Sequence, residues 1–220
     1  MFDCVKFHEF ENYFYQEHAQ SFELLPGKGP VMISAPHSVE QTRNHRKKVA
    51  EPQTGALAKM LHSVLGCPVI YKTRNCNDDA NFDAVSPYKQ ALASYIHSND
   101  VAFLLDLHQL ASSRKVNISI GTGHGKNISR KEFVDVTVKA FQTRNVQPIG
   151  IDSPFAAAYP YTVSSYISST CKISCLQIEI NSSILRLDET NSQTKQVFDA
   201  LVELVQSLST ILQEDKNEKR

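Results

Sequence analysis

The stretch VMISAPHSVE, residues 31–40, decides how the rest of the sequence is interpreted. Its first half, VMISA, predicts a buried strand, and Pro36 must end that strand because proline cannot donate to a sheet ladder. His37 opens the turn that follows, and Glu40 comes three residues later. A histidine and a carboxylate at the end of a core strand suit a metal ion, because metal ligands need a rigid scaffold.

Apolar runs and helical patterns alternate along the remainder of the chain. The predicted strands are 31–35, 67–73, 101–108, 116–121 and 175–180. The predicted helices are 52–65, 87–98, 130–144, a short helix after 162, and a final amphipathic helix from about 190 to 213. Loops are expected at 41–51, 74–83 and 150–162, and a frayed tail at 214–220. Strands that are apolar throughout and alternate with helices predict an α/β protein with a mostly parallel sheet covered on both faces.

Length, charge and cysteine content restrict the class of protein. The 220 residues contain no obvious linker, which predicts one domain with residues 1–29 as a peripheral segment. The 23 basic and 23 acidic residues balance, which argues against a nucleic-acid binder. Five cysteines without a CxxC pair argue against a cysteine-type zinc site and fit free thiols in a reducing compartment. The first residues lack a signal-peptide pattern and no apolar run could span a membrane, so a soluble cytoplasmic protein is expected.

Polar residues at the ends of two predicted strands form the candidate metal site. His108 ends one apolar strand as His37 follows another, and the carboxyl ends of parallel strands meet at one edge of a sheet. Two histidines and a carboxylate are a ligand set of catalytic zinc. Asp106 lies two residues before His108, on the same strand face, where it would orient the ring. A structural role for both histidines is the alternative, and the isolated HxxE of His8 and Glu11 shows that this spacing alone is unspecific.

Three further residues are candidates for catalysis or binding. Glu179 is the carboxylate of the apolar run CLQIEI, where a charge is costly to bury, so we expect either a general base or an ion pair with an arginine. Arg74 follows the strand 67–73 and would clamp a substrate carbonyl or carboxylate, unless it is an ordinary surface side chain. His124, in the loop GTGHGKN, would line the pocket; the loop lacks the phosphate-binding Walker pattern.

Four segments together resemble the N-formylglutamate amidohydrolases, within the wider group of zinc carboxypeptidases and aspartoacylases. They are SAPHS (34–38), NDDANFD (77–83), LLDLH (104–108) and PFAAAY…LQIEIN (154–181). The resemblance implies a zinc-exopeptidase-like, three-layer α/β/α fold with a mostly parallel or mixed sheet, and hydrolysis of an N-acyl bond by a metal-activated water. It implies one Zn²⁺ or other divalent ion per chain, held by His37 and His108. It further implies Glu179 as general base and substrate contacts from Arg74 and Asn81.

The acidic metal ligand and the substrate-binding charge stay open at this point. Zinc carboxypeptidases use the glutamate of HxxE, which is Glu40 here, whereas formylglutamate hydrolases often lack it, and Glu51 before the predicted helix is the other candidate. The Asn-Arg pair of the aspartoacylase branch is Asn81-Phe82 in this chain, and PFAAAYPYTV also lacks the arginine of the deformylase pattern. The candidates to replace the missing charge are Arg43, Arg46 and Arg114.

These features favour a zinc-dependent amidohydrolase that acts on a small N-acyl amino acid or a short peptide-like amide. One alternative is a zinc carboxypeptidase acting on peptides or cell-wall fragments, and another is a non-catalytic ligand-binding protein of the same fold. No nucleic-acid or membrane partner is expected. The sequence does not indicate the oligomeric state, the acyl group or the native metal.

Overall fold

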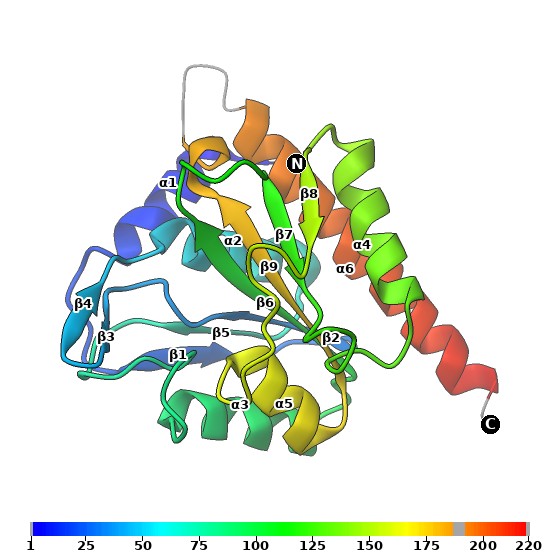
Figure 1. The fold of residues 1–220 in the computed structure, drawn as a ribbon, viewed down its shortest axis with the longest axis horizontal. Helices are drawn as coiled ribbons and strands as arrows, with labels where there is room; N and C mark the ends of the chain where they lie inside the picture. Colours follow the sequence, from blue (N-terminus) through cyan, green and yellow to red (C-terminus); the bar gives the residue numbers. More distant parts are fainter. Residues whose placement is uncertain (1, 187–191, 219–220) are drawn as a thin grey trace.

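The computed structural model describes residues 2–186 and 192–218. A seven-stranded sheet forms the middle layer of the molecule (Figure 1). The strand order is β1-β5-β2-β6-β9-β7-β8. The strands are β1 (Phe22–Leu25), β2 (Val31–Ala35), β5 (Val69–Lys72), β6 (Phe103–Leu110), β7 (Ile118–Gly121), β8 (Ile149–Ile151) and β9 (Ser174–Asn181). A separate hairpin consists of β3 (Gln41–Arg43) and β4 (Arg46–Lys48).

Helices cover both faces of the sheet, as Figure 1 shows. The helices are α1 (Cys4–Tyr13), α2 (Pro52–Leu65), α3 (Pro87–Ser98), α4 (Glu132–Thr143), α5 (Val163–Cys171) and α6 (Ser192–Glu218). One apolar core lies between the sheet and α1, α2, α4 and α6, and a second lies between the sheet and α3 and α5. The predicted three-layer α/β/α arrangement is confirmed.

The centre of the sheet is parallel and its flanks are antiparallel. Strands β5, β2, β6 and β9 run in parallel, whereas β1 is antiparallel to β5 and β7 is antiparallel to β9. The chain leaves β2 through α2 to β5 on one side, then returns through α3 to β6 on the other side. Ligands of open α/β sheets bind at such a reversal, in the crevice outside the carboxyl ends of the two strands.

The sheet face toward α3 and α5 changes from apolar to polar along the strands. Met32, Leu104 and Cys175 belong to the apolar core on this face. Successive side chains of a strand alternate between faces, so the residues two and four positions further on share that face. Those residues are Ser34, Asp106, His108, Gln177 and Glu179, all buried. The polar end of this face therefore lies at the crevice beside the carboxyl ends of β2 and β6.

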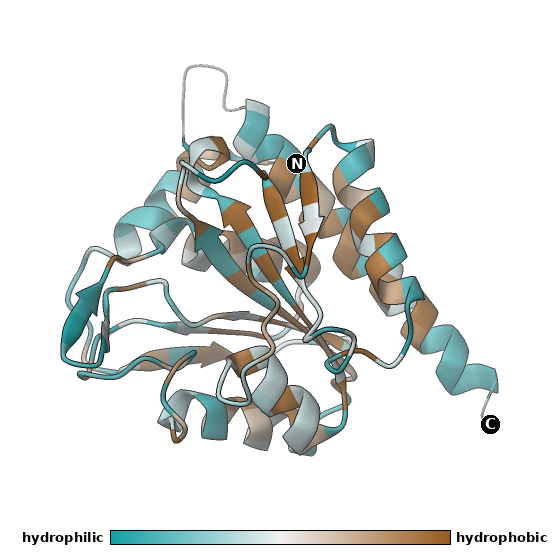
Figure 2. Cartoon of the chain, viewed as in Figure 1, coloured by the Kyte–Doolittle hydropathy of each residue, from teal (hydrophilic) through white to brown (hydrophobic). Residues whose placement is uncertain are grey.

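Two elements in the predicted loops escaped the sequence analysis. Residues 41–51 contain the β3–β4 hairpin, whose turn residues Asn44 and His45 both have positive φ, as a type I′ hairpin turn requires. The residues of both strands are hydrophilic (Figure 2), so the sequence lacks the alternation of apolar and polar residues that would indicate strands here. The short strand β8 lies at the start of the predicted loop 150–162.

The ends of the chain also differ from the expectation. Residues 1–29 contain α1, which packs on α2, and the edge strand β1. The final helix continues past residue 213 to Glu218, so the predicted frayed tail is helical that far; residues 190, 191, 219 and 220 lie outside the described part. Strand β6 also runs past His108 to Leu110. In the described part of the chain, no helix combines the length and apolar character needed to cross a membrane.

Candidate metal centre

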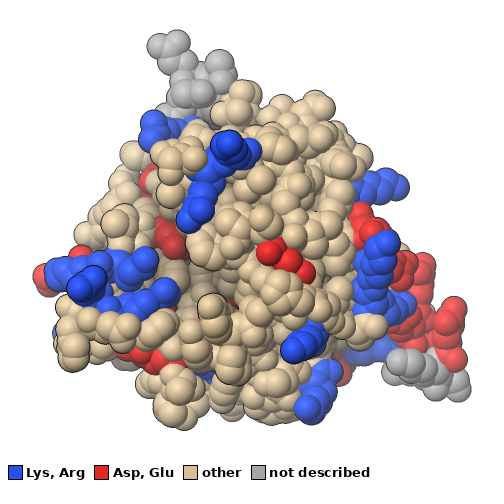
Figure 3. Space-filling view, viewed as in Figure 1, with Lys and Arg blue, Asp and Glu red and all other residues tan. Residues whose placement is uncertain are grey.

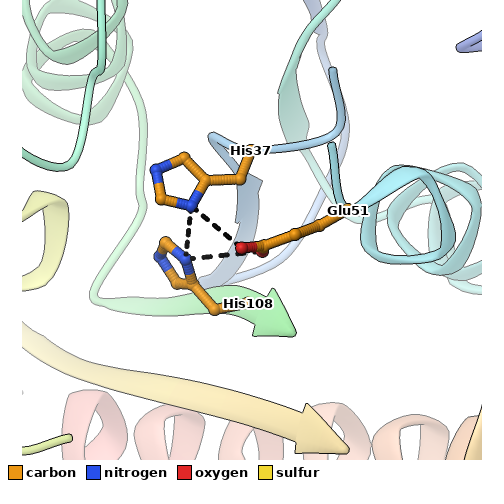
Figure 4. A group of neighbouring side chains, drawn as sticks. All are labelled: His37, Glu51 and His108. Atoms are coloured by element: carbon orange, nitrogen blue, oxygen red, sulfur yellow. Dashed lines mark hydrogen bonds and ion pairs between the residues drawn. The ribbon is translucent and has the colours of Figure 1, made fainter. Parts of the chain in front are cut away.

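Three side chains from different elements converge at the crevice (Figure 4). His37 follows β2, His108 lies near the end of β6, and Glu51 directly precedes α2. His37 and His108 are 7% and 2% exposed. Among the described residues, these three form the group of possible metal ligands, with one donor atom of each within 4.8 Å of the others.

The position of Glu51 follows from local backbone bonding. Its N–H donates to the carbonyl of His37 at 2.8 Å, so the chain returns to His37 after the β3–β4 hairpin. Strand β2 ends at Ala35, so the last residues of β6 have no neighbouring strand on the β2 side. There the N–H of Gln109 donates to Glu51 Oε2 at 2.9 Å instead. Pro52 then begins α2, whose N-terminus favours a negative charge.

The facing atoms are two imidazole nitrogens and a carboxylate. His37 Nδ1 lies 3.2 Å from His108 Nδ1 and 3.1 Å from Glu51 Oε1, and His108 Nδ1 lies 3.7 Å from Glu51 Oε2. On the far side of each ring, Nε2 is bound to a buried carboxylate: His37 to Asp79 Oδ1 at 2.9 Å and His108 to Asp106 Oδ2 at 3.2 Å.

This network fits a metal ion. The bonds to Asp79 and Asp106 place the ring protons on Nε2, so the two Nδ1 lone pairs face each other. Two lone pairs and a carboxylate at such short range repel unless a proton or a metal ion lies between them. A ligating histidine that donates its second N–H to a carboxylate is the usual arrangement around zinc, and two histidines with a carboxylate match a catalytic zinc ligand set.

The electrostatic field at this point favours positive charge. Burial alone would lower the pKa of His37, but the carboxylates of Glu51 and Asp79 raise it to about 10. Burial would likewise lower the pKa of His108, and Asp106 outweighs it and raises that pKa. Asp79 has its pKa held well below the usual range, against the effect of its own burial, by His37 and Arg43.

Glu179 lies beside this group. It is opposite His108 in the parallel β6–β9 register and accepts a hydrogen bond from Gln177 Nε2 at 3.0 Å. Burial raises the pKa of Glu179 to about 7, against the opposing charge of His108. The structure thus places a buried carboxyl that can hold or release a proton next to a candidate metal ligand.

The structure separates the two glutamates that the sequence left open. Glu51 joins the histidines, whereas Glu40 lies outside the group and pairs with Lys47 at 3.0 Å. Asp106 holds His108 as expected. Arg74 lines a cavity of about 770 Å³ that also includes Glu40 but none of the three candidate ligands.

The predicted substrate-binding residues have varied positions. The side-chain oxygen of Asn81 accepts a hydrogen bond from Val163 N at 2.7 Å, so it holds the start of α5 instead of facing the site. His124 is exposed, 3.8 Å from Asp152. Arg114 lies over the ring of Phe155, and Arg46 is exposed on β4. Among the four arginines proposed, Arg43 alone contacts the carboxylate network, through Asp79.

No role was predicted for Asp79 or Gln177. Asp79 is fully buried and lies in NDDANFD, a segment that resembled the known family, but its pairing with His37 spans 42 positions. Gln177 is the polar residue two positions before Glu179, the same spacing that identified Asp106 before His108. The alternation rule therefore offered a signal for Gln177 and none for Asp79.

Comparisons with known proteins support the fold. A scan against protein-family models found no match, and a search of curated proteins found none. The N-formylglutamate amidohydrolase from Ralstonia eutropha JMP134 is a similar solved structure, with a TM-score of 0.63, 15% identity, and coverage of 89% of this chain and 99% of that chain. A bacteriophage poly-gamma-glutamate hydrolase has a TM-score of 0.58 and 10% identity over 90% of this chain and 94% of its own. A metallo-carboxypeptidase from Burkholderia cenocepacia has a TM-score of 0.50 and 14% identity over 85% of this chain and 61% of its own.

Proposed function

We propose that this chain is a zinc-dependent hydrolase that cleaves the amide bond of a small N-acyl amino acid or a short peptide-like amide. The observation that carries the proposal is the convergence of His37 Nδ1, His108 Nδ1 and the Glu51 carboxylate, with a buried carboxylate behind each ring. The shared fold with an amidohydrolase and a poly-gamma-glutamate hydrolase is consistent with it.

The residues that would hold the ion are His37, Glu51 and His108. A zinc ion there supplies a Lewis acid that polarises a carbonyl group and activates water at neutral pH. Asp79 and Asp106 keep the two rings in the tautomer whose Nδ1 atoms face inward. Because both rings are buried, their Nε2 atoms bind these carboxylates and are shielded from bulk water.

Glu179 is the proton carrier in this proposal. It stands beside His108 in the sheet, and its Oε1 is fixed by Gln177. From that position its carboxylate would accept a proton from the attacking water and donate it to the leaving amine, as a general base that becomes a general acid. Such proton transfer contributes roughly 10²- to 10⁴-fold to a rate.

Arg43 is the group we expect to meet a substrate carboxylate. Its guanidinium lies 4.7 Å from the ring centroid of Phe82, the residue that stands where the family pattern has arginine. Two of its nitrogens contact Asp79, and its Nη1 has no partner among the described residues. Lysine and arginine side chains also gather over the β3–β4 hairpin (Figure 3), which would attract an anionic substrate.

Hydrolysis of a panel of N-acyl amino acids by the zinc-loaded protein tests this function. We expect turnover of at least one compound, with Glu179→Gln reducing kcat by 100-fold or more while zinc stays bound. Glu40→Gln is the matched control, because Glu40 is a nearby acid outside the group, and it should keep near-normal kcat. Near-normal turnover by Glu179→Gln would refute the assigned role.

A zinc carboxypeptidase is the second candidate, because the metallo-carboxypeptidase shares the fold. It predicts the release of a C-terminal amino acid from unblocked peptides and no cleavage of N-acyl amino acids. Assaying both compound classes with one preparation separates the two activities.

A further inference from the structure

We propose that Tyr159 and Tyr161 form a stacking platform for an aromatic acyl group of the substrate. The inference deepens and rests on the proposed function, since it names the class of amide that the site would take: an N-aroyl amino acid. The platform consists of these two rings, in the segment that joins β8 to α5.

The two rings are stacked in parallel and remain accessible. Their centroids are 5.4 Å apart and their planes differ by 2°. Tyr159 is 66% exposed, although a large aromatic ring normally buries most of its surface. Its carbonyl accepts hydrogen bonds from the N–H and the hydroxyl of Thr162, so the backbone that presents it is fixed. An ordered, exposed aromatic face binds a flat apolar group with little loss of side-chain entropy.

The platform is tied to the loop that carries Asp79. The buried amine of Lys89 donates to the carbonyls of Tyr161 and Asp83, at 2.7 and 2.6 Å. Asn81, in the same loop, holds the N-terminus of α5 directly after the platform. The ring of Tyr161 also packs edge-on against Phe82, with 5.3 Å between centroids. These contacts give the platform a defined position relative to the candidate metal centre.

A continuous series of contacts leads from the platform to a candidate ligand. The guanidinium of Arg43 lies over the ring of Phe82 and contacts Asp79 at 2.8 Å. Asp79 in turn contacts His37 at 2.9 Å. These contacts link the exposed ring of Tyr159 to the candidate metal centre through Tyr161, Arg43 and Asp79. A ligand that reaches both would place an aromatic ring on Tyr159 and a carboxylate near Arg43.

The chemistry of the segment favours an uncharged occupant. Residues 153–163, SPFAAAYPYTV, contain no charged side chain, whereas the β3–β4 hairpin, which carries Arg43, is basic. Phe155 in the same segment is 42% exposed. An apolar aromatic face and a guanidinium match the two ends of an N-aroyl amino acid. N-benzoylglycine has both groups, and N-acetylglycine lacks the ring.

Fluorescence provides a direct binding test, because the chain contains no tryptophan. Tyr159→Trp keeps an aromatic face and introduces a single indole at the platform. Tyr15→Trp is the matched control, because Tyr15 is also 66% exposed but belongs to the N-terminal segment. Both zinc-loaded variants are titrated with N-benzoylglycine and with N-acetylglycine, and Tyr159→Ala is titrated by calorimetry beside the wild type.

We expect N-benzoylglycine to change the fluorescence of Tyr159→Trp in a saturable way, at concentrations at least tenfold below those required of N-acetylglycine, with no saturable change in Tyr15→Trp. We also expect Tyr159→Ala to weaken binding of N-benzoylglycine by roughly 3- to 10-fold and to leave N-acetylglycine unchanged. Equal responses to both compounds, or a saturable response of Tyr15→Trp, would overturn the platform. Selective binding without hydrolysis would support the platform and count against the proposed function, whereas hydrolysis without selectivity would do the opposite.

Discussion

Replacement of Asp79 by asparagine tests the carboxylate that stands behind His37. Asp79 is fully buried and accepts hydrogen bonds from His37 Nε2 at 2.9 Å, from Arg43 Nε at 2.9 Å and from Asn81 N at 3.0 Å. Asp79→Asn preserves the volume of the side chain but removes its charge and turns one acceptor atom into a donor. The change therefore weakens the orientation of His37 without opening a cavity.

This substitution should change both the affinity for zinc and the stability of the metal-free protein. Loss of a carboxylate that orients a ligating histidine typically weakens metal binding 10- to 100-fold, or about 1.4 to 2.7 kcal/mol. In the metal-free protein, breaking a buried ion pair costs about 3 to 5 kcal/mol when both partners are enclosed. The Arg43 side chain is 30% exposed, so water compensates part of that loss. We expect the free energy of unfolding without metal to fall by about 1 to 3 kcal/mol.

Two assays measure these effects separately. Competition with a chromophoric chelator gives the zinc dissociation constant, and urea unfolding in chelator gives the metal-free stability. Asp100→Asn is the control, because the Asp100 side chain is 96% exposed and forms only a surface ion pair with Lys216, at 3.5 Å. Neither the zinc dissociation constant nor the metal-free stability should change measurably in this variant. A zinc dissociation constant within twofold of the wild type would refute the reasoning, since His37 would then not depend on Asp79.

Three further predictions concern stability, each measured by urea unfolding. Phe7→Ala should cost about 3 to 5 kcal/mol, because Phe7 is fully buried and fastens the N-terminal helix to the core; a cost below 1 kcal/mol would contradict that packing. Gly55→Ala should destabilise the protein although alanine favours helices, because the new Cβ would lie 2.6 Å from the Cβ of Ser38; a gain in stability would show that the neighbouring side chains yield. Burial alone would raise the pKa of Glu23, but hydrogen bonds such as that from Tyr71 outweigh burial and lower this pKa. The stability that Glu23 contributes is therefore present above about pH 4 and is lost as the pH falls further. Glu23→Gln should flatten this acid limb relative to the wild type, and an unchanged slope would exclude Glu23 as its source.

The central strands were predictable because each is a short, apolar run with clear boundaries. Val31–Ala35 and Pro52–Leu65 begin and end where proline and glycine predict. His108, Asp106 and Glu179 were visible as polar residues in apolar runs, and alternation along a strand placed them on one face. The sequence was informative here because strand geometry converts spacing directly into direction.

The choice between Glu40 and Glu51 required the three-dimensional structure. The chain between them forms a hairpin, which carries Glu40 away to Lys47 and returns Glu51 to the carbonyl of His37. Asp79 was hidden for the same reason, because loop segments have no periodicity from which a direction can be inferred. Spacing along the chain cannot describe a contact that depends on the path of a loop.

The N-terminal helix was not predicted, although Phe7, Phe10 and Phe14 have the helical spacing i, i+3, i+7 and pack on the core. The helix is only ten residues long and fully buries only Phe7 among its own residues, so this pattern is short. Tertiary contacts with α2 provide most of its stabilisation, and such contacts outweigh weak local preferences.

The most direct test of the account is the zinc content of purified protein after saturation and removal of excess metal. We predict about one zinc per chain in the wild type and in Glu40→Ala, and almost none in His37→Ala/His108→Ala or in Glu51→Ala. His8→Ala, at the exposed histidine of the HxxE in α1, should keep its zinc. A wild type that binds no zinc, or a Glu51→Ala variant that binds it as tightly as the wild type, would contradict the metal centre assigned to His37, Glu51 and His108.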